Sequence, residues 1–87
     1  MIATEMPITD RELLIAFKGG DMQAYARIMI RYQVFTNRVA FAFTKDKDKA
    51  AELTIKVFMR LWNKRDDIPE SASIMAYLCK FTRELSQ

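Results

Sequence analysis

The 87-residue sequence contains no histidine and only one cysteine, Cys79. Histidine is the most common general base, and a lone thiol with no base to activate it is a poor nucleophile. A single cysteine also cannot form a disulfide within the chain, which fits a reducing compartment. No carboxylate pair or metal-ligand cluster has a recognisable spacing, and no glycine-rich phosphate loop is present. These absences predict that the protein is not an enzyme and holds no metal or cofactor.

Turn-forming residues and long apolar runs are also scarce. The chain has two glycines and two prolines, which favours helices over a sheet with tight turns. No apolar stretch approaches the roughly 20 residues that a membrane span requires. Residues 1–7 lack the basic start and the long apolar run of a secretory signal. We therefore expect a cytoplasmic protein with no membrane partner.

The first half of the chain predicts two helices. Thr9 and Glu12 form a capping box for a short first helix, in which each side chain accepts a hydrogen bond from the other residue's backbone N–H. Gly19-Gly20 ends this helix because a left-handed closing residue costs glycine little. Asp21 caps a long second helix, whose apolar period reaches about Thr44.

The second half predicts a long helix over 49–65, a loop over 66–73 and a C-terminal helix. The caps expected for these two helices are Asp46 or Asp48 and Ser71 or Ser73. Pro69 supports the loop because it disfavours helical backbone at the residue before it. The prediction is an all-α fold, a compact bundle of four helices in a single domain over 1–87 with an ordered core at about 9–86.

Large side chains follow the helical period closely enough to predict much of the core. The aromatic residues expected there are Phe17, Tyr25, Phe35, Phe43 and Phe58. The segment 49–65 has a surplus, because Ile55, Met59 and Trp62 widen its apolar arc to roughly 240° of the circumference. This width predicts a second burial against a partner. Trp62 suits packing at the edge of the domain as well as it suits stacking on a ligand.

Positive charge gathers in the middle of the chain. The net charge is +3, but residues 45–65 carry seven basic groups against three acids. A basic middle suits a phosphate backbone, and it equally suits a solvated surface. Charge alone does not separate these two interpretations.

Several short motifs occur in a specific order along the chain. They are Gly20-Asp21, Ala24-Tyr25, Arg31-Tyr32, the run Ala50–Trp62, and Ala76-Tyr77-Leu78. In this order and spacing, over about residues 10–85, the chain resembles region 2 of bacterial extracytoplasmic-function (ECF) sigma factors, in the sigma-70 family. The resemblance implies a helical domain with no small-molecule substrate. Such a domain docks on the clamp coiled coil of the RNA polymerase β′ subunit and melts the promoter minus-ten element.

The resemblance also implies which residues bind each partner. The residues implied to bind the polymerase core are Glu52, Ile55, Lys56 and Met59. The residues implied to bind the non-template DNA strand are Arg60, Trp62, Lys64, Arg65, Tyr77, Lys80 and Arg83, because capture of a single strand needs aromatic stacking and positive charge. An anti-sigma factor is a further implied partner. The second, promoter-reading domain of a complete member is expected to be absent from this chain.

Four positions depart from the family pattern. The family's polar docking residues Asp, Gln and Glu correspond here to Glu52, Ile55 and Lys56. Ile55 replaces a hydrogen-bonding group with an apolar one, and Lys56 reverses a charge, which is repulsive if the partner's face is basic. Glu84 adds negative charge on the side expected to meet DNA. Two alternatives therefore stay open: a divergent sigma-like protein-interaction module with weak or no DNA binding, and a free-standing helical nucleic-acid binder.

Overall fold

The computed structural model describes residues 8–87, which form four α-helices and one short 3₁₀ helix. Their bounds are Asp10–Lys18 for α1, Met22–Thr44 for α2, Lys47–Asn63 for α3, Arg65–Asp67 for the 3₁₀ helix η1 and Ile74–Leu85 for α4. The described residues contain no β-strand, so the predicted all-α fold of four helices is confirmed. The expectation about a secretory signal concerns residues 1–7, which lie outside the described part of the chain.

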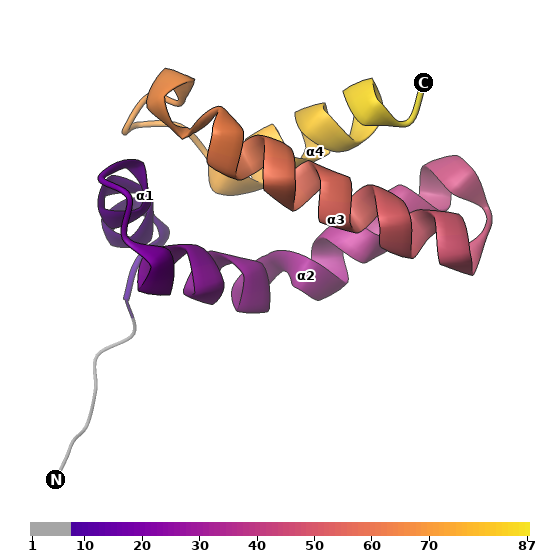
Figure 1. Ribbon diagram of the computed structural model, residues 1–87, viewed down its shortest axis with the longest axis horizontal. Coiled ribbons are helices and arrows are strands. Elements are labelled where there is room, and N and C mark those ends of the chain that lie inside the picture. The colour runs from indigo at the N-terminus through magenta and orange to yellow at the C-terminus, as the bar shows by residue number, and fades with distance from the viewer. Residues whose placement is uncertain (1–7) are drawn as a thin grey trace, which may run out of the picture.

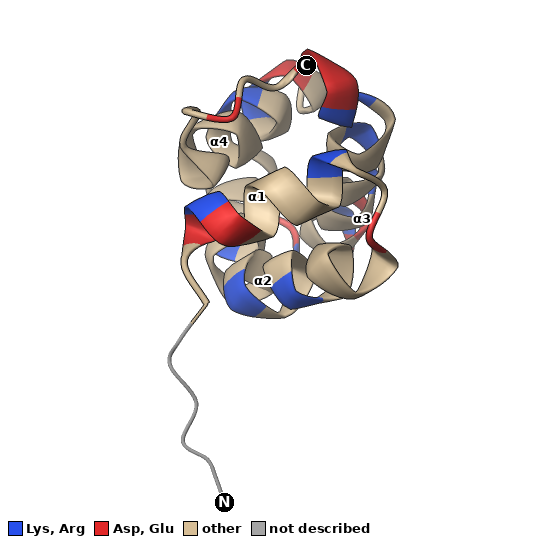
Figure 2. Ribbon diagram, turned by 90° about the vertical axis from the view of Figure 1, so that its left-hand side faces the viewer, with Lys and Arg blue, Asp and Glu red and all other residues tan. Residues whose placement is uncertain are grey.

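The helices are arranged around a long antiparallel pair. Figure 1 shows α2 and α3 side by side, joined by a short turn, with α4 behind α3. α4 packs against both members of the pair. α1 crosses the end of the bundle where α2 begins and α3 ends, as the end-on view in Figure 2 shows. The Cα atoms span 44 × 29 × 18 Å, so the bundle is long and thin.

The predicted signals at the start of the chain are present. The backbone N–H of Glu12 donates to Thr9 Oγ1 at 3.1 Å, and the Thr9 N–H donates to Glu12 Oε1 at 3.0 Å. The bond from the Thr9 N–H, together with one from the Thr9 hydroxyl to Glu12 Oε1 at 3.1 Å, stabilises the carboxylate and lowers the pKa of Glu12. Gly20 has φ 92°, so it is the left-handed residue that closes α1. Asp21 Oδ1 then accepts the Gln23 N–H at 2.9 Å and starts α2.

The structure also decides between the caps left open for the later helices. Asp46 caps α3, because its Oδ1 accepts the N–H groups of Asp48 at 2.9 Å and Lys49 at 3.0 Å. Ser73 caps α4 through the Ala76 N–H at 3.1 Å. With Asp46 as cap, α3 begins at Lys47 and ends at Asn63, slightly earlier at each end than the predicted 49–65. The chain then tightens into η1 instead of continuing the helix.

Every helix contributes side chains to one continuous core. Its buried apolar members include Leu13, Leu14, Phe17, Ile28, Leu53, Val57, Phe58, Leu61, Ile74, Leu78 and Phe81. Of the predicted aromatic core residues, Phe17 and Phe58 are buried, while Tyr25 and Phe35 are partly buried and pack against the core. Trp62 also packs at its edge.

The prediction that Phe43 is a core residue is wrong, since its side chain is 48% exposed. The buried residues of α2 are spaced four apart: Ala24, Ile28, Tyr32, Thr36 and Ala40. A line with this spacing winds around a helix by about 40° per step. In the last turns of α2 the line therefore passes through Thr36 and Ala40, and it leaves Phe43 to one side. A helical period shows which residues share a face, but it does not show how the neighbouring helices cross that face.

A polar cluster fastens α1 to α2. The Tyr32 hydroxyl donates to Asp10 Oδ2, and Arg31 Nη1 lies 2.7 Å from Asp10 Oδ1. Arg31 Nη2 also donates to the Ile8 carbonyl at 2.8 Å. Burial, together with the hydrogen bond to the Asp10 carboxylate, raises the pKa of Tyr32 to about 12. We refer to Asp10, Arg31 and Tyr32 as the α1 latch.

Three aromatic rings join α1, α2 and α3 at the same end of the bundle. The ring centroid of Tyr25 lies 5.5 Å from that of Phe17 and 5.0 Å from that of Trp62. The Tyr25 hydroxyl donates to the Phe58 carbonyl at 2.6 Å, which fixes the ring in place, and burial raises the pKa of Tyr25. We refer to Phe17, Tyr25 and Trp62 as the aromatic cluster.

Candidate functional site

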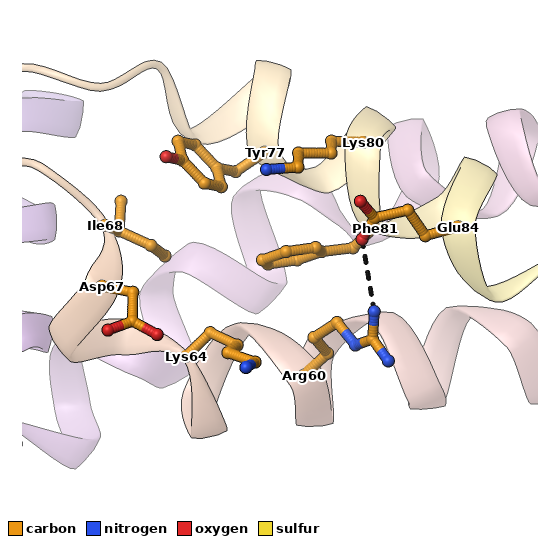
Figure 3. Close-up of a pocket in the computed structure, with 8 residues that line it drawn as sticks. All are labelled: Arg60, Lys64, Asp67, Ile68, Tyr77, Lys80, Phe81 and Glu84. Carbon is orange, nitrogen blue, oxygen red and sulfur yellow. Dashed lines mark hydrogen bonds and ion pairs between the residues drawn. The ribbon is translucent and has the colours of Figure 1, made fainter.

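A pocket of about 310 Å³ lies between α3 and α4, next to the turn through η1 (Figure 3). Its lining consists of Arg60, Lys64, Asp67, Ile68, Tyr77, Lys80, Phe81 and Glu84. Arg60 lies in the last turn of α3, and Lys64 follows one turn later as the C-cap residue of that helix, so the two lie on the same side of it. Ile68 closes one end, and Lys18 of α1 donates to the Ile68 carbonyl. We refer to this site as the α3–α4 pocket.

Aromatic rings and cations alternate along the α4 side of the pocket. The Tyr77 and Phe81 rings meet edge to face, with centroids 5.7 Å apart and planes 66° apart. Lys80 Nζ lies 5.3 Å from the Tyr77 centroid, and Arg60 Cζ lies 5.9 Å from the Phe81 centroid. Phe81 is buried, whereas Tyr77 is only partly buried. The accessible part of the Tyr77 ring therefore lies beside positive charge.

Two carboxylates share the pocket with three cations. Glu84 Oε1 lies 3.2 Å from Arg60 Nη1, so the acid that the sequence placed on the DNA side is paired with a cation predicted to bind DNA (Figure 3). The pair is exposed, with side-chain exposures of 36% for Arg60 and 42% for Glu84. Exposed pairs contribute only about 0–1 kcal/mol to stability. The ion pair therefore affects the charge offered to a ligand more than it affects folding.

The structure brings together four of the seven residues predicted to bind DNA: Arg60, Lys64, Tyr77 and Lys80. Trp62 and Arg65 do not line this pocket, and they contact each other instead. The Arg65 Cζ is 4.0 Å from the Trp62 centroid, and Arg65 Nη1 donates to the Trp62 carbonyl at 2.9 Å. The Trp62 ring also contacts Phe17 and Tyr25, the other two members of the aromatic cluster. Arg83 is exposed on α4 and does not line the pocket.

The four residues predicted to bind polymerase share the solvent-facing side of α3. Ile55 is 62% exposed and Met59 is 57% exposed, and Glu52 and Lys56 are also exposed. Their spacing places them on one face of the helix. The surplus apolar surface predicted for this helix is therefore open to solvent at Ile55 and Met59.

An exposed apolar stripe on α2 was not predicted from the sequence. Ile30, Val34 and Phe41 of α2 are 76%, 60% and 43% exposed. They are spaced four and seven residues apart, which places them on one face of α2. A helical projection of α2 shows this spacing, but the sequence alone did not distinguish the stripe from a buried face.

No group of three or more His, Cys, Asp or Glu side chains among residues 8–87 is placed to hold a metal ion. None of the helices found there is long and apolar enough to cross a membrane. The α3–α4 pocket presents ammonium, guanidinium and phenol groups, which suit phosphate contacts and base stacking.

The described residues thus form a small helical domain that carries a partly basic pocket and exposed apolar side chains on α2 and α3. A sequence comparison shows a more specific similarity: the chain is 29% identical over 69 residues to a probable RNA polymerase sigma factor, RfaY, from Xanthomonas campestris pv. campestris. The match covers 79% of this chain but only 17% of that protein. No family model matches the chain, and no solved structure matches it. The chain thus contains a sigma-factor-like region.

Proposed function

We propose that this chain is a region 2 domain of an ECF sigma factor, which recruits RNA polymerase and opens promoter DNA at the minus-ten element. The similarity to a probable sigma factor supports the role in transcription initiation. The observation that carries the DNA-binding part is the α3–α4 pocket, where Arg60, Lys64 and Lys80 line the same pocket as Tyr77. The domain would act by binding alone and would need no cofactor.

In this proposal the pocket holds the unpaired non-template strand. The partly buried Tyr77 ring provides a face for a base, and stacking of this kind contributes about 1–3 kcal/mol per base. Lys64 and Lys80 lie on opposite sides of the pocket, at the C-cap of α3 and on α4. They would contact the phosphates on either side of the stacked base.

The proposed polymerase surface lies on a different side of α3. At about 100° per residue, Arg60 and Lys64 are separated from Ile55 and Met59 by roughly 100–180° around the helix. A β′ clamp segment on Ile55 and Met59 would therefore leave the α3–α4 pocket accessible to DNA. An anti-sigma factor that covered the same side of α3 would compete with the polymerase.

A salt titration tests the DNA part. Labelled single-stranded promoter oligonucleotide is titrated with the protein at several salt concentrations, and binding is followed by fluorescence anisotropy. Each phosphate contact on a single strand contributes about 0.7 to the slope of log K against log salt, so Lys64→Ala with Lys80→Ala should lower the slope by about 1.4.

The matched control changes the same charge at the other end of α3. Lys47 and Lys49 are exposed there, so Lys47→Ala with Lys49→Ala should leave the slope unchanged. Absence of binding at low salt, or an equal loss in both double variants, would count against the DNA role.

The Arg60–Glu84 pair favours a second candidate, a sigma-like protein-interaction module with weak or no DNA binding. In that case the ion pair would occupy the pocket permanently. Co-purification with a polymerase β′ fragment, together with no binding to the oligonucleotide, would support this candidate. A free-standing nucleic-acid binder would instead bind DNA of any sequence with steep salt dependence and would not retain the β′ fragment.

A further inference from the structure

A second hollow, of about 440 Å³, lies between the start of α2 and the end of α3. It is lined by Met22, Tyr25, Met59, Trp62 and Asn63, and it shares no residue with the α3–α4 pocket. Tyr25 and Trp62 are partly buried members of the aromatic cluster, so they form a fixed floor. Met22 and Met59 are 60% and 57% exposed and form the rim.

A third hollow, of about 320 Å³, adjoins this one and is basic. Its lining consists of Lys56, Met59, Arg60, Asn63, Lys64 and Leu85. Met59 and Asn63, one turn apart on α3, line both hollows and form the ridge between them. No carboxylate lines either hollow. Among residues 8–87, Glu84 is paired with Arg60, but no acid forms an ion pair with Lys56 or Lys64.

We propose that the two hollows together bind an amphipathic helix of a partner protein, with the apolar face of that helix flanked by acidic residues. A helix laid along the Met59–Asn63 ridge would place apolar side chains over Met22 and Trp62. Carboxylates on its neighbouring face would meet Lys56 and Lys64. This arrangement is the helix-in-groove mode, and exposed methionines adapt well to apolar side chains of different shapes.

Charge complementarity selects this occupant. The basic hollow would repel a helix flanked by lysine or arginine, because like charges across an interface are costly. A lipid surface would use the cations but would make little use of a hollow floored by two aromatic rings. A nucleic acid would need an open ring face for stacking, but Phe17 stacks against Tyr25 and Arg65 lies over the Trp62 ring. The inference rests on the proposed function, since Lys56 and Met59 also belong to the proposed polymerase surface, and Arg60 and Lys64 also line the α3–α4 pocket. It adds the chemistry of the partner.

The test uses three synthetic helical peptides of about 18 residues, long enough to form some helix on their own. They carry the same leucine stripe and are flanked by glutamate, glutamine or lysine. Calorimetric titration of the full chain at low salt should show the glutamate peptide binding about tenfold more tightly than the glutamine peptide, with the lysine peptide weakest. Anionic vesicles serve as a separate probe for a lipid surface.

Exposed positions provide variants that should still fold. Met22→Gln with Met59→Gln should weaken binding of the glutamate peptide about tenfold, whereas Ile30→Gln on the outer face of α2 should not. Lys56→Glu should reverse the preference toward the lysine peptide, whereas Lys47→Glu should leave it unchanged. Circular dichroism of each variant checks that its helix content is retained.

Three results would overturn the inference: equal affinity for the acidic and basic peptides, binding indifferent to the methionine variants, or Lys56-dependent binding to vesicles without peptide binding. The oligonucleotide titration and the β′ co-purification are run on the same variants. If those succeed while the peptides fail, only this inference fails. If the peptides bind while DNA and β′ do not, the groove stands and the proposed function fails.

Discussion

The α1 latch should make the free energy of unfolding depend on pH in the alkaline range, and the substitution Tyr32→Phe isolates this effect. Tyr32 is buried and its hydroxyl donates to Asp10, so the phenol must stay protonated in the folded protein. Its pKa is raised to about 12 from an ordinary value of 10.0. The stabilisation linked to this raised pKa is complete below pH 10. It is lost as the pH rises through about 12, because the unfolded chain releases the proton first.

The size of the effect follows from the two pKa values. A pKa difference of one unit corresponds to about 1.4 kcal/mol. The folded state should therefore lose about 2–3 kcal/mol of stability by pH 12, because the stabilisation by the α1 latch is lost there. In Tyr32→Phe the phenol is gone, and this part of the pH dependence should vanish. At neutral pH the same substitution should cost about 1–2 kcal/mol, because the hydrogen bond to Asp10 is lost.

The assay is urea unfolding followed by circular dichroism at several pH values between 9 and about 12, near the ordinary and raised tyrosine pKa values. Lysines also titrate in this range, so the informative quantity is the difference between the unmodified protein and Tyr32→Phe. Tyr77→Phe is the control, since Tyr77 lies on α4 and outside the latch. Parallel pH curves for the unmodified protein and Tyr32→Phe would refute the reasoning.

Two further predictions concern the pocket and the core. Glu84→Gln removes the partner of Arg60, so it should strengthen oligonucleotide binding several-fold in the anisotropy titration, and unchanged or weaker binding would contradict the role given to Glu84. The Phe17 side chain has 0% exposure and contacts both other members of the aromatic cluster. Phe17→Ala should therefore lower the free energy of unfolding in urea by about 3–5 kcal/mol. Phe43→Ala, at a side chain that is 48% exposed, should change it by about 0.5 kcal/mol or less, and equal losses from the two substitutions would contradict the assignment of the core.

The helices were predictable because their signals are local. A capping box at Thr9 and Glu12 and a cap at Asp21 each act within three residues of the chain. The hydrophobic period then indicates one face of each helix. The error at Phe43 arose where local signals end, since the path of a neighbouring helix decides which part of a face is covered.

The candidate site was predictable in its residue types but not in its grouping. Lys64 and Lys80 come from different helices, and only the packing of α4 on α3 brings them to one pocket. The pairing of Glu84 with Arg60 depends on the same packing. Ile68 gave no signal, because an isolated apolar residue in a loop has no period to reveal its burial. The hollow between Met22 and Met59 was not predicted either, because it joins segments that are far apart in the sequence.

The thinness of the bundle has a consequence for regulation. The Cα atoms extend only 18 Å in the shortest direction. α3 contributes to the α3–α4 pocket on one side and to the hollow rimmed by Met22 and Met59 on another. A ligand that shifts or rotates α3 from one side therefore changes the geometry on the other. Any such change in affinity must be reciprocal, because linked binding equilibria alter each other by the same factor. α3 is thus the element that both surfaces share, and the reciprocity would appear as an equal change in the affinity of each surface for its ligand.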